Sequence, residues 1–198
     1  MDTNILPRMR LSASFVEKLD SLRCRYIDAL TYVSTVEMAM AVPILQRARS
    51  VGVKLIFIGN GGSAAIASHM AIDYQKNGGM RALAFNDAAA LTCLANDLGH
   101  ERGLEHQVDA HAYPQDVLVA VSSSGQSVNI LNATRAAARR GCSVITLSGF
   151  DEDNPLRMLG GVNFHVPSRS YGIVELAHLF ILHAMLDSII EENRITVS

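Results

Sequence analysis

The spacing of apolar residues divides the chain into a helical N-terminal part and a longer alternating part. Between residues 11 and about 50, apolar side chains recur at three- and four-residue spacing, which indicates amphipathic helices. Pro43 in this stretch predicts a kink or the start of a second helix. The stretch holds no convincing catalytic cluster. We therefore expect residues 1–50 to pack on the domain or on another subunit.

From residue 53 onward, short apolar runs alternate with longer helical patterns. Such alternation is typical of a parallel sheet that is covered by helices on both faces. We predict an α/β domain over residues 51–198, in which ligands bind at the carboxyl ends of the strands. The expected strands are 53–58, 82–85, 117–121, 143–147 and 163–166, and the expected helices are 63–76, 88–96, 102–111, 127–140 and 172–192.

Two turns rich in glycine and serine each follow an expected strand and precede an expected helix. They read Gly-Asn-Gly-Gly-Ser at residues 59–63, the glycine turn, and Ser-Ser-Ser-Gly-Gln-Ser at residues 122–127, the anion turn. Free N–H groups and the positive end of a helix dipole attract anions, and hydroxyls add donors. Either turn alone is equally well explained as a cap and a turn. Together they suggest a phosphorylated small molecule, and neither matches the Walker or G-x-G-x-x-G pattern.

Composition narrows the class of protein. With 198 residues, 49% of them hydrophobic and 18% charged, the chain can bury a sizeable core. A net charge of −2 does not indicate a nucleic-acid binder. The three cysteines are widely spaced without a Cys-x-x-Cys pair, so neither a disulfide framework nor a cysteine zinc site is expected.

The location of the protein is expected to be the cytoplasm. Residues 1–15 lack the apolar core of a secretory signal, and the few cysteines fit a reducing compartment. The apolar segment 176–186 is too short to cross a bilayer. We therefore expect no membrane partner.

Two histidines and two carboxylates are candidates for a metal or acid–base site. His69 and Asp73 are four residues apart on one helix, so they share a face. Glu175 and His183 lie roughly 80° apart around the last helix, whereas His178 and His183 are roughly 140° apart, so His178 should face elsewhere. The set suits zinc binding or proton transfer. Singly, each has a plainer explanation, an intrahelical pair or a core histidine; a shared sheet edge with two anion-binding turns favours one site.

Taken together, these motifs resemble those of the bacterial phosphoheptose isomerases, which belong to the sugar-isomerase (SIS) domain family. The resemblance covers about residues 15 to 190 and keeps the order and spacing of every motif. Its motifs are residues 59–65, His69, Asn96 with Asp97, residues 122–127, and Glu175 with His183. On residues alone, Asn96 and Asp97 either orient sugar hydroxyls or simply end a helix.

The resemblance implies a flavodoxin-like five-stranded parallel sheet sandwiched by helices, and a homotetramer with N-terminal helices and active sites between subunits. It implies isomerisation of sedoheptulose 7-phosphate to D-glycero-D-manno-heptose 7-phosphate, for lipopolysaccharide or other surface-glycan heptose. It assigns the phosphate to Ser122, Ser123, Ser124 and Ser127. It assigns the sugar to Asn60, Gly61, Gly62, Asn96, Asp97 and Glu175. It places His69, Asp73, Glu175 and His183 on zinc positions, with Asp73, Glu175 and His183 also catalytic.

Two positions depart from that family pattern. The family usually has glutamate where this chain has Asp73, and glutamine where it has Glu175. Aspartate is one methylene shorter, and Glu175 compensates by bringing charge to a metal or by serving as the base. The hypothesis is therefore a cytoplasmic sugar-phosphate isomerase. The alternative is a non-catalytic SIS-domain regulator that binds a sugar phosphate or a protein, and the retained histidines favour the enzyme.

Overall fold

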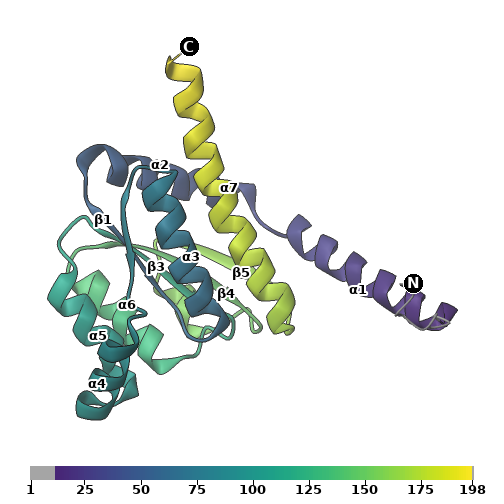
Figure 1. Cartoon of the computed structure of the whole chain (residues 1–198), viewed down its shortest axis with the longest axis horizontal. Helices are drawn as coiled ribbons and strands as arrows, with labels where there is room; N and C mark the ends of the chain where they lie inside the picture. Colours follow the sequence, from purple (N-terminus) through teal and green to yellow (C-terminus); the bar gives the residue numbers. More distant parts are fainter. Residues whose placement is uncertain (1–11, 198) are drawn as a thin grey trace, which may run out of the picture.

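Five parallel strands form the centre of the molecule (Figure 1). The computed structural model describes residues 12–197, with side chains as far as residue 192. The sheet has the order β2-β1-β3-β4-β5, the order of flavodoxin-like folds, and all four pairings are parallel. The predicted α/β sheet is confirmed. The strands are β1 (Lys54–Ile58), β2 (Arg81–Ala84), β3 (Val117–Ser122), β4 (Ser143–Gly149) and β5 (Val162–Val166).

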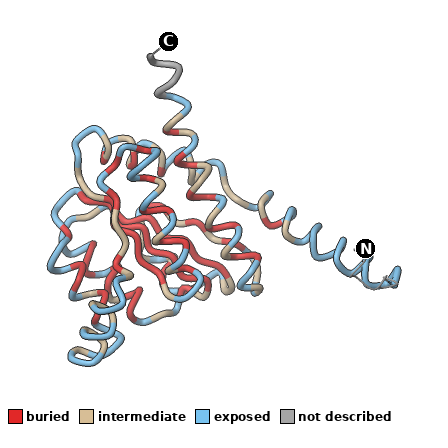
Figure 2. The backbone as a smooth tube through the Cα atoms, viewed as in Figure 1, coloured by how far each residue is buried: buried red, intermediate tan, exposed pale blue. Residues whose placement is uncertain are grey.

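The helices cover the two faces of the sheet. One face carries α2, α3 and α7, and the other carries α5, α6 and the short 3₁₀ helix η1, so that two separate apolar cores form. Every residue of β3 is buried between them, as expected for a central strand of a covered parallel sheet (Figure 2). The elements are α1 (Ala13–Thr31), α2 (Thr35–Val51), α3 (Gly62–Lys76), α4 (Ala88–Leu98), α5 (His100–His111), α6 (Val128–Arg139), η1 (Pro155–Met158) and α7 (Tyr171–Val197).

The N-terminal region contains two helices, but its break does not lie at Pro43. The chain ends α1 at Thr31 and restarts at Thr35, where the hydroxyl of Ser34 accepts a hydrogen bond from a backbone N–H in the first turn. Pro43 lies inside α2, so the expectation that it starts a helix was wrong. Of the predicted region 1–50, residues 1–11 lie outside the described residues.

Helix α1 extends away from the rest of the molecule (Figures 1 and 2). Ala29 is its one buried residue. Phe15 and Leu19 are each half exposed, and Ile27 is 55% exposed, although all are apolar. An amphipathic helix whose apolar side chains have so little cover within their own chain favours contact with a second copy, which stays a prediction.

Helix α7 is longer than its apolar segment suggested. The stretch Tyr171–Glu192 is long and apolar enough to cross a membrane by length and composition, and α1 with α2 would pass only as a pair bent by 59°. Half of the α7 stretch is buried within the fold. A core helix of this kind meets the same criteria, so the finding is weak evidence for a membrane span.

The strand order changes direction between β1 and β3. In such sheets, ligands bind beyond the carboxyl ends of the strands at this point. The glycine turn follows β1 and the anion turn follows β3, so the two turns flank it. The topology therefore brings both predicted motifs to the expected ligand position.

Candidate active site at the carboxyl edge of the sheet

The glycine turn is shaped by close contacts that exclude side chains. A Cβ at Gly59 would lie 2.5 Å from the carbonyl group of Ser63, and a Cβ at Gly62 would lie 2.4 Å from a carboxylate oxygen of Glu175. Gly61 has a φ of +53°, a conformation that favours glycine. Because Gly61 is the N-cap of α3 and provides no side-chain cap, the first N–H groups of that helix remain available to a ligand.

The anion turn leads from β3 into α6. Within it, Gly125 N–H donates to the Ser122 carbonyl at 3.0 Å, and Gln126 N–H donates to the Ser124 hydroxyl at 3.2 Å. Ser127 is the N-cap of α6 but makes no side-chain cap bond. The buried Ser123 hydroxyl has no hydrogen-bond partner among the described residues. This leaves hydroxyls and a helix N-terminus for an anion.

A pair of asparagines joins the two turns. Asn60 Nδ2 donates to Asn129 Oδ1 at 2.9 Å, and Asn129 Nδ2 donates to Asn60 Oδ1 at 2.8 Å. Asn129 is 4% exposed and lies in the first turn of α6. The Asn60 side chain, predicted to line the sugar, is thus engaged in holding the turns together.

Three of the four predicted metal or acid–base residues meet between α3 and α7. His69 Nε2 lies 3.5 Å from Asp73 Oδ2, and His183 Nδ1 lies 4.0 Å from the same oxygen. The two imidazole rings are 5.4 Å apart, edge to face. One ligand atom from each residue falls within 4.8 Å of the others. His183 is half-buried beside Asp73, so it is not an ordinary core histidine.

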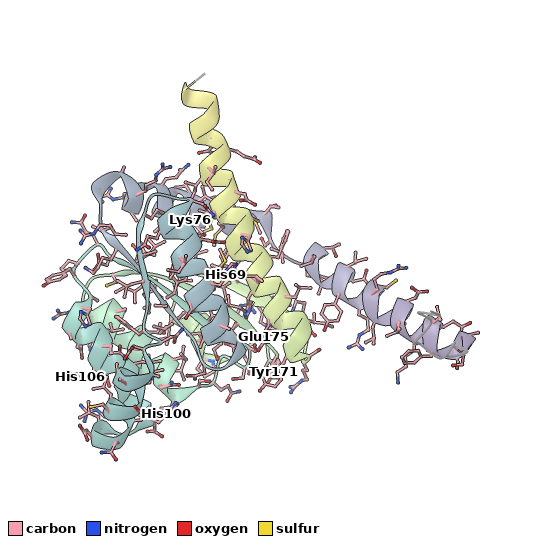
Figure 3. All side chains as sticks on the ribbon, in the orientation of Figure 1. His69, Lys76, His100, His106, Tyr171 and Glu175 are labelled. Atoms are coloured by element: carbon pink, nitrogen blue, oxygen red, sulfur yellow. The ribbon has the colours of Figure 1, made fainter. Side chains whose placement is uncertain are left out.

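Glu175 lies two turns before His183 on α7, near the start of α3 (Figure 3). Its carboxylate rests against Gly62 rather than in the cluster of His69, Asp73 and His183. Its place among metal ligands stays a prediction. The position instead puts a carboxylate beside the glycine turn, where a bound sugar would lie if the anion turn held its phosphate.

Asn96 and Asp97 are placed differently from the other predicted residues. Both are exposed near the end of α4, and their side-chain hydrogen bonds among the described residues are with each other and with Cys93. In Figure 1, α4 lies at the far end of α5, away from α3 and α7. Among the described residues, the structure does not bring this pair to the rest of the site within one chain.

His178 faces away from the cluster, as its angular position predicted, and it lies in the core. It is fully buried, and its Nε2–H group donates to the Ser148 carbonyl at 3.0 Å. Burial lowers the pKa of His178 to about 4, because the charged form would lose its hydration. The imidazole is therefore neutral at physiological pH and is not one of the acid–base candidates.

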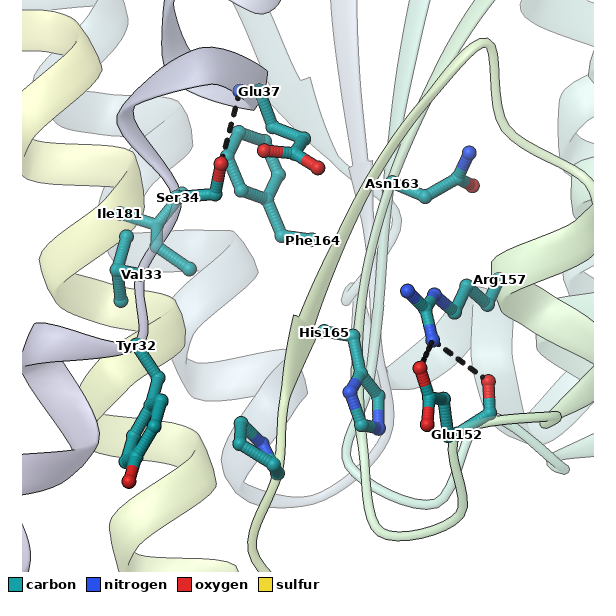
Figure 4. A pocket seen from close by; sticks show the side chains of 11 residues that line it. Tyr32, Val33, Ser34, Glu37, Glu152, Arg157, Asn163, Phe164, His165 and Ile181 are labelled. Carbon is teal, nitrogen blue, oxygen red and sulfur yellow. Dashed lines mark hydrogen bonds and ion pairs between the residues drawn. The ribbon is translucent and has the colours of Figure 1, made fainter.

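A cavity of about 290 Å³ lies apart from these residues, between the α1–α2 connection and β5 (Figure 4). Arg157 contacts Glu152 on one wall, and the ring of His165 lies nearby. Burial, followed by the charge of Arg157, lowers the pKa of His165. None of the predicted site residues lines this cavity.

Two asparagines at the sheet edge were missed from the sequence. Asn129 pairs with Asn60, and Asn154 caps η1 and lies against Gly125 of the anion turn. A signal existed for the second, because Asn-Pro often opens a turn or a helix. For Asn129 the signal was absent, since its partner is 69 residues away in the chain.

Comparisons with known proteins identify the family to which this fold belongs. A family model described as SIS domain matches residues 24–149. The phosphoheptose isomerase of Solidesulfovibrio magneticus is 36% identical over 184 residues, which cover 89% of this chain and 87% of that protein. The solved phosphoheptose isomerase of Neisseria gonorrhoeae superposes with a TM-score of 0.80 at 31% identity, covering 88% of this chain and 98% of that one. That of Francisella tularensis has the same TM-score at 25% identity, covering 89% and 98%.

Proposed function

Because the chain belongs to the SIS-domain family and, within it, to the phosphoheptose isomerases, we propose that it converts sedoheptulose 7-phosphate into D-glycero-D-manno-heptose 7-phosphate. One observation carries the proposal: His69, Asp73 and His183 converge between α3, which begins at the glycine turn, and α7, whose Glu175 lies against that turn. We infer that this acid–base group and the anion turn serve one sugar phosphate, as a sugar-phosphate isomerase requires.

The anion turn anchors the substrate. The phosphate accepts hydrogen bonds from the hydroxyls of Ser123, Ser124 and Ser127 and from N–H groups at the start of α6. An anchored phosphate fixes the distance from the bound end of the sugar to its reacting carbons. Holding those carbons beside the acid–base group removes much of the entropic part of the barrier.

The reaction is a proton transfer through an enediol. A base removes one proton from C1 of the ketose, beside the C2 carbonyl, while the carbonyl oxygen gains a proton. The enediol then loses its C1 hydroxyl proton and receives a proton at C2, which gives the aldose. We assign this exchange to Asp73 and His183, whose side chains lie 4.0 Å apart, and we assign Glu175 to the sugar and to assistance of the base.

The donor set fits a divalent ion. Two imidazole nitrogens and one carboxylate oxygen within 4.8 Å of one another correspond to the three protein ligands of a catalytic zinc site. We propose that His69, Asp73 and His183 hold zinc, with Glu175 as the fourth candidate ligand. Bound zinc would supply polarisation of a substrate oxygen.

We further propose a cytoplasmic homotetramer that feeds heptose to surface-glycan synthesis, without nucleic-acid or membrane partners. The uncovered apolar side chains of α1 support an assembly. The exposure of Asn96 and Asp97, away from the other sugar-binding candidates, supports a site that two subunits share.

The experiment is incubation of zinc-replete protein with sedoheptulose 7-phosphate, followed by detection of the aldose product. Turnover would support the proposed isomerase activity. Binding of the sugar phosphate without turnover at any metal supplement would overturn it in favour of the regulator. A matched His106→Ala protein, altered on the exposed face of α5, should behave as the wild type.

A further inference from the structure

A buried asparagine packs against the backbone of the anion turn. Asn154 lies in the loop between β4 and η1 and is 1% exposed. A Cβ built on Gly125 would fall 1.9 Å from Asn154 Oδ1, so the carboxamide rests directly on the backbone of the turn. Gly125 has a φ of +64°, and no other residue fits between this backbone and the carboxamide.

Hydrogen bonds fix the orientation of that carboxamide. Asn154 Nδ2 donates to the Asp151 carbonyl at 2.8 Å and to the Ser148 hydroxyl at 3.1 Å. Its Oδ1 accepts a hydrogen bond from the backbone N–H group of Arg157 at 3.1 Å. The side chain therefore cannot rotate away from Gly125 without breaking buried bonds, each of which is costly to leave unmade.

The segment from β4 to η1 also contacts the anion turn through backbone hydrogen bonds. Leu156 N–H donates to the Gly125 carbonyl at 3.1 Å, and Gly149 N–H donates to the Ser123 carbonyl at 2.9 Å. Asn154 lies between these two bonds in the chain. Its position thus sets how the segment from β4 to η1 meets the turn.

Ser148 connects this support to the helix that carries the acid–base residues. Its carbonyl accepts from His178 Nε2–H, and its hydroxyl accepts from Asn154. His178 lies on α7 between Glu175 and His183. A buried path of hydrogen bonds therefore runs from α7 through Ser148 to Asn154, whose carboxamide packs against Gly125 of the anion turn.

We propose that Asn154 is a positioning residue for the substrate phosphate. It acts through Gly125, by fixing the position of the anion turn relative to α7. It does not contact the substrate itself. The inference rests on the proposed function, because it assumes that the anion turn holds the phosphate.

The chain provides a matched control in Asn163. Its carboxamide also closes a local turn against a glycine: Oδ1 accepts from Gly160 N–H at 3.1 Å, and a Cβ at Gly160 would lie 2.5 Å from that oxygen. It also accepts from Thr146 Oγ1 at 2.6 Å. This second pair lies beside β5, and no contact between Asn163 and the anion turn is found among the described residues.

The test compares Asn154→Ala with Asn163→Ala. Both should lower thermal stability, because each removes several hydrogen bonds of a carboxamide that is at least partly buried. Only Asn154→Ala should weaken the binding of inorganic phosphate, measured by calorimetric titration, by about tenfold. It should also raise KM by about tenfold, while kcat changes less than about threefold. Equal KM and phosphate affinity in the two variants would overturn the positioning role.

Ser148→Ala keeps the proposal testable if Asn154→Ala unfolds, and a double-mutant cycle of Gly125→Ala with Asn154→Ala tests it further if the variants fold. Ser148→Ala removes a single hydrogen bond of Asn154, so it should give a weaker form of the same KM effect. In the cycle, Gly125→Ala should harm phosphate binding less when residue 154 is already alanine, since the new methyl then has room. Additive effects, or a KM unmoved by Ser148→Ala, would contradict the proposal.

The same data separate the two levels of inference. A wild type that neither binds inorganic phosphate nor turns over the heptose phosphate defeats the proposed function. A wild type that does both, beside an Asn154→Ala variant with unchanged phosphate affinity, defeats the positioning role alone.

Discussion

Two regions of the molecule differ in what fixes their position. One is the sheet edge between β1 and β3, and the other consists of the outlying helices α1 and α4. At the sheet edge, the two turns are joined by Asn60 and Asn129, and His183 faces Asp73 within one chain. On α4, by comparison, no residue is buried, and α1 buries one alanine. The geometry of the sheet edge is thus set by the chain's own contacts. Helix α4 packs on α5, but its exposed surface, like that of α1, gains further cover only from another molecule.

The largest effect is expected at the sheet edge. Asp73→Asn and His183→Ala should each lower kcat by about two to four orders of magnitude, the range for removing a general acid or base. Steady-state kinetics with sedoheptulose 7-phosphate measure it. His106→Ala, an exposed histidine on α5, is the control and should leave kcat unchanged. Near-normal turnover in both site variants would break the assignment.

The buried packing behind the site should respond to acid. The pKa of His178 is lowered from its ordinary value of 6.5 to about 4 in the folded protein. The unfolded chain therefore binds this proton first, and the stability from neutral His178 is present above pH 6.5 and is lost as pH falls towards 4. The loss amounts to about 3 kcal/mol of unfolding free energy.

Urea unfolding at pH 7 and pH 4.5 measures this effect. His178→Gln keeps an N–H donor for the Ser148 carbonyl but does not titrate, so its unfolding free energy should fall less between the two pH values. His106→Gln should retain the wild-type difference. If wild type and His178→Gln lose stability equally, the buried histidine is not the source.

The outlying region should matter for assembly. Replacing Phe15 and Leu19 by glutamate places charges on the exposed apolar side chains of α1. Light scattering should then show the mass falling from about four chains towards one chain of 21.4 kDa. Lys18→Ala on the same helix should leave the mass unchanged. A wild type that is already monomeric at micromolar concentration would remove the tetramer and the shared site.

The smallest effect concerns one hydroxyl of the anion turn. Ser124→Ala should weaken substrate binding by about 1 kcal/mol, roughly fivefold, the contribution of one hydrogen bond to a charged group. Calorimetric titration with the substrate measures it. Thr92→Ala, on exposed α4, should have no effect. Unchanged affinity in Ser124→Ala would exclude a direct contact by that hydroxyl.

Much of the fold followed from apolar periodicity. All five strands lie within two residues of their expected bounds, because buried parallel strands are continuous apolar runs with turn residues at each end. The break between α1 and α2 was misjudged, since Pro43 is tolerated inside α2 while the Ser34 cap marks the true start. Helix propensity alone does not decide between such signals.

The site was less completely predictable. His69, Asp73 and His183 could be grouped, because helical spacing places His69 and Asp73 on one face of α3, and the fold brings α7 beside that helix. Local sequence could not show that Glu175 would rest on Gly62, or that Asn129 would occupy the side chain of Asn60. Those contacts join segments far apart in the chain, and they depend on how the helices pack.

Solvent exchange during turnover shows whether Asp73 and His183 move a proton through an enediol. Zinc-replete wild-type protein is given sedoheptulose 7-phosphate in deuterium oxide, and the product is analysed by NMR and mass spectrometry. We expect an aldose that carries deuterium at C2 in at least part of the product. We expect His183→Ala to form no aldose above background. Product without deuterium would contradict proton transfer with solvent-exchangeable groups, and the absence of product would contradict the isomerase itself.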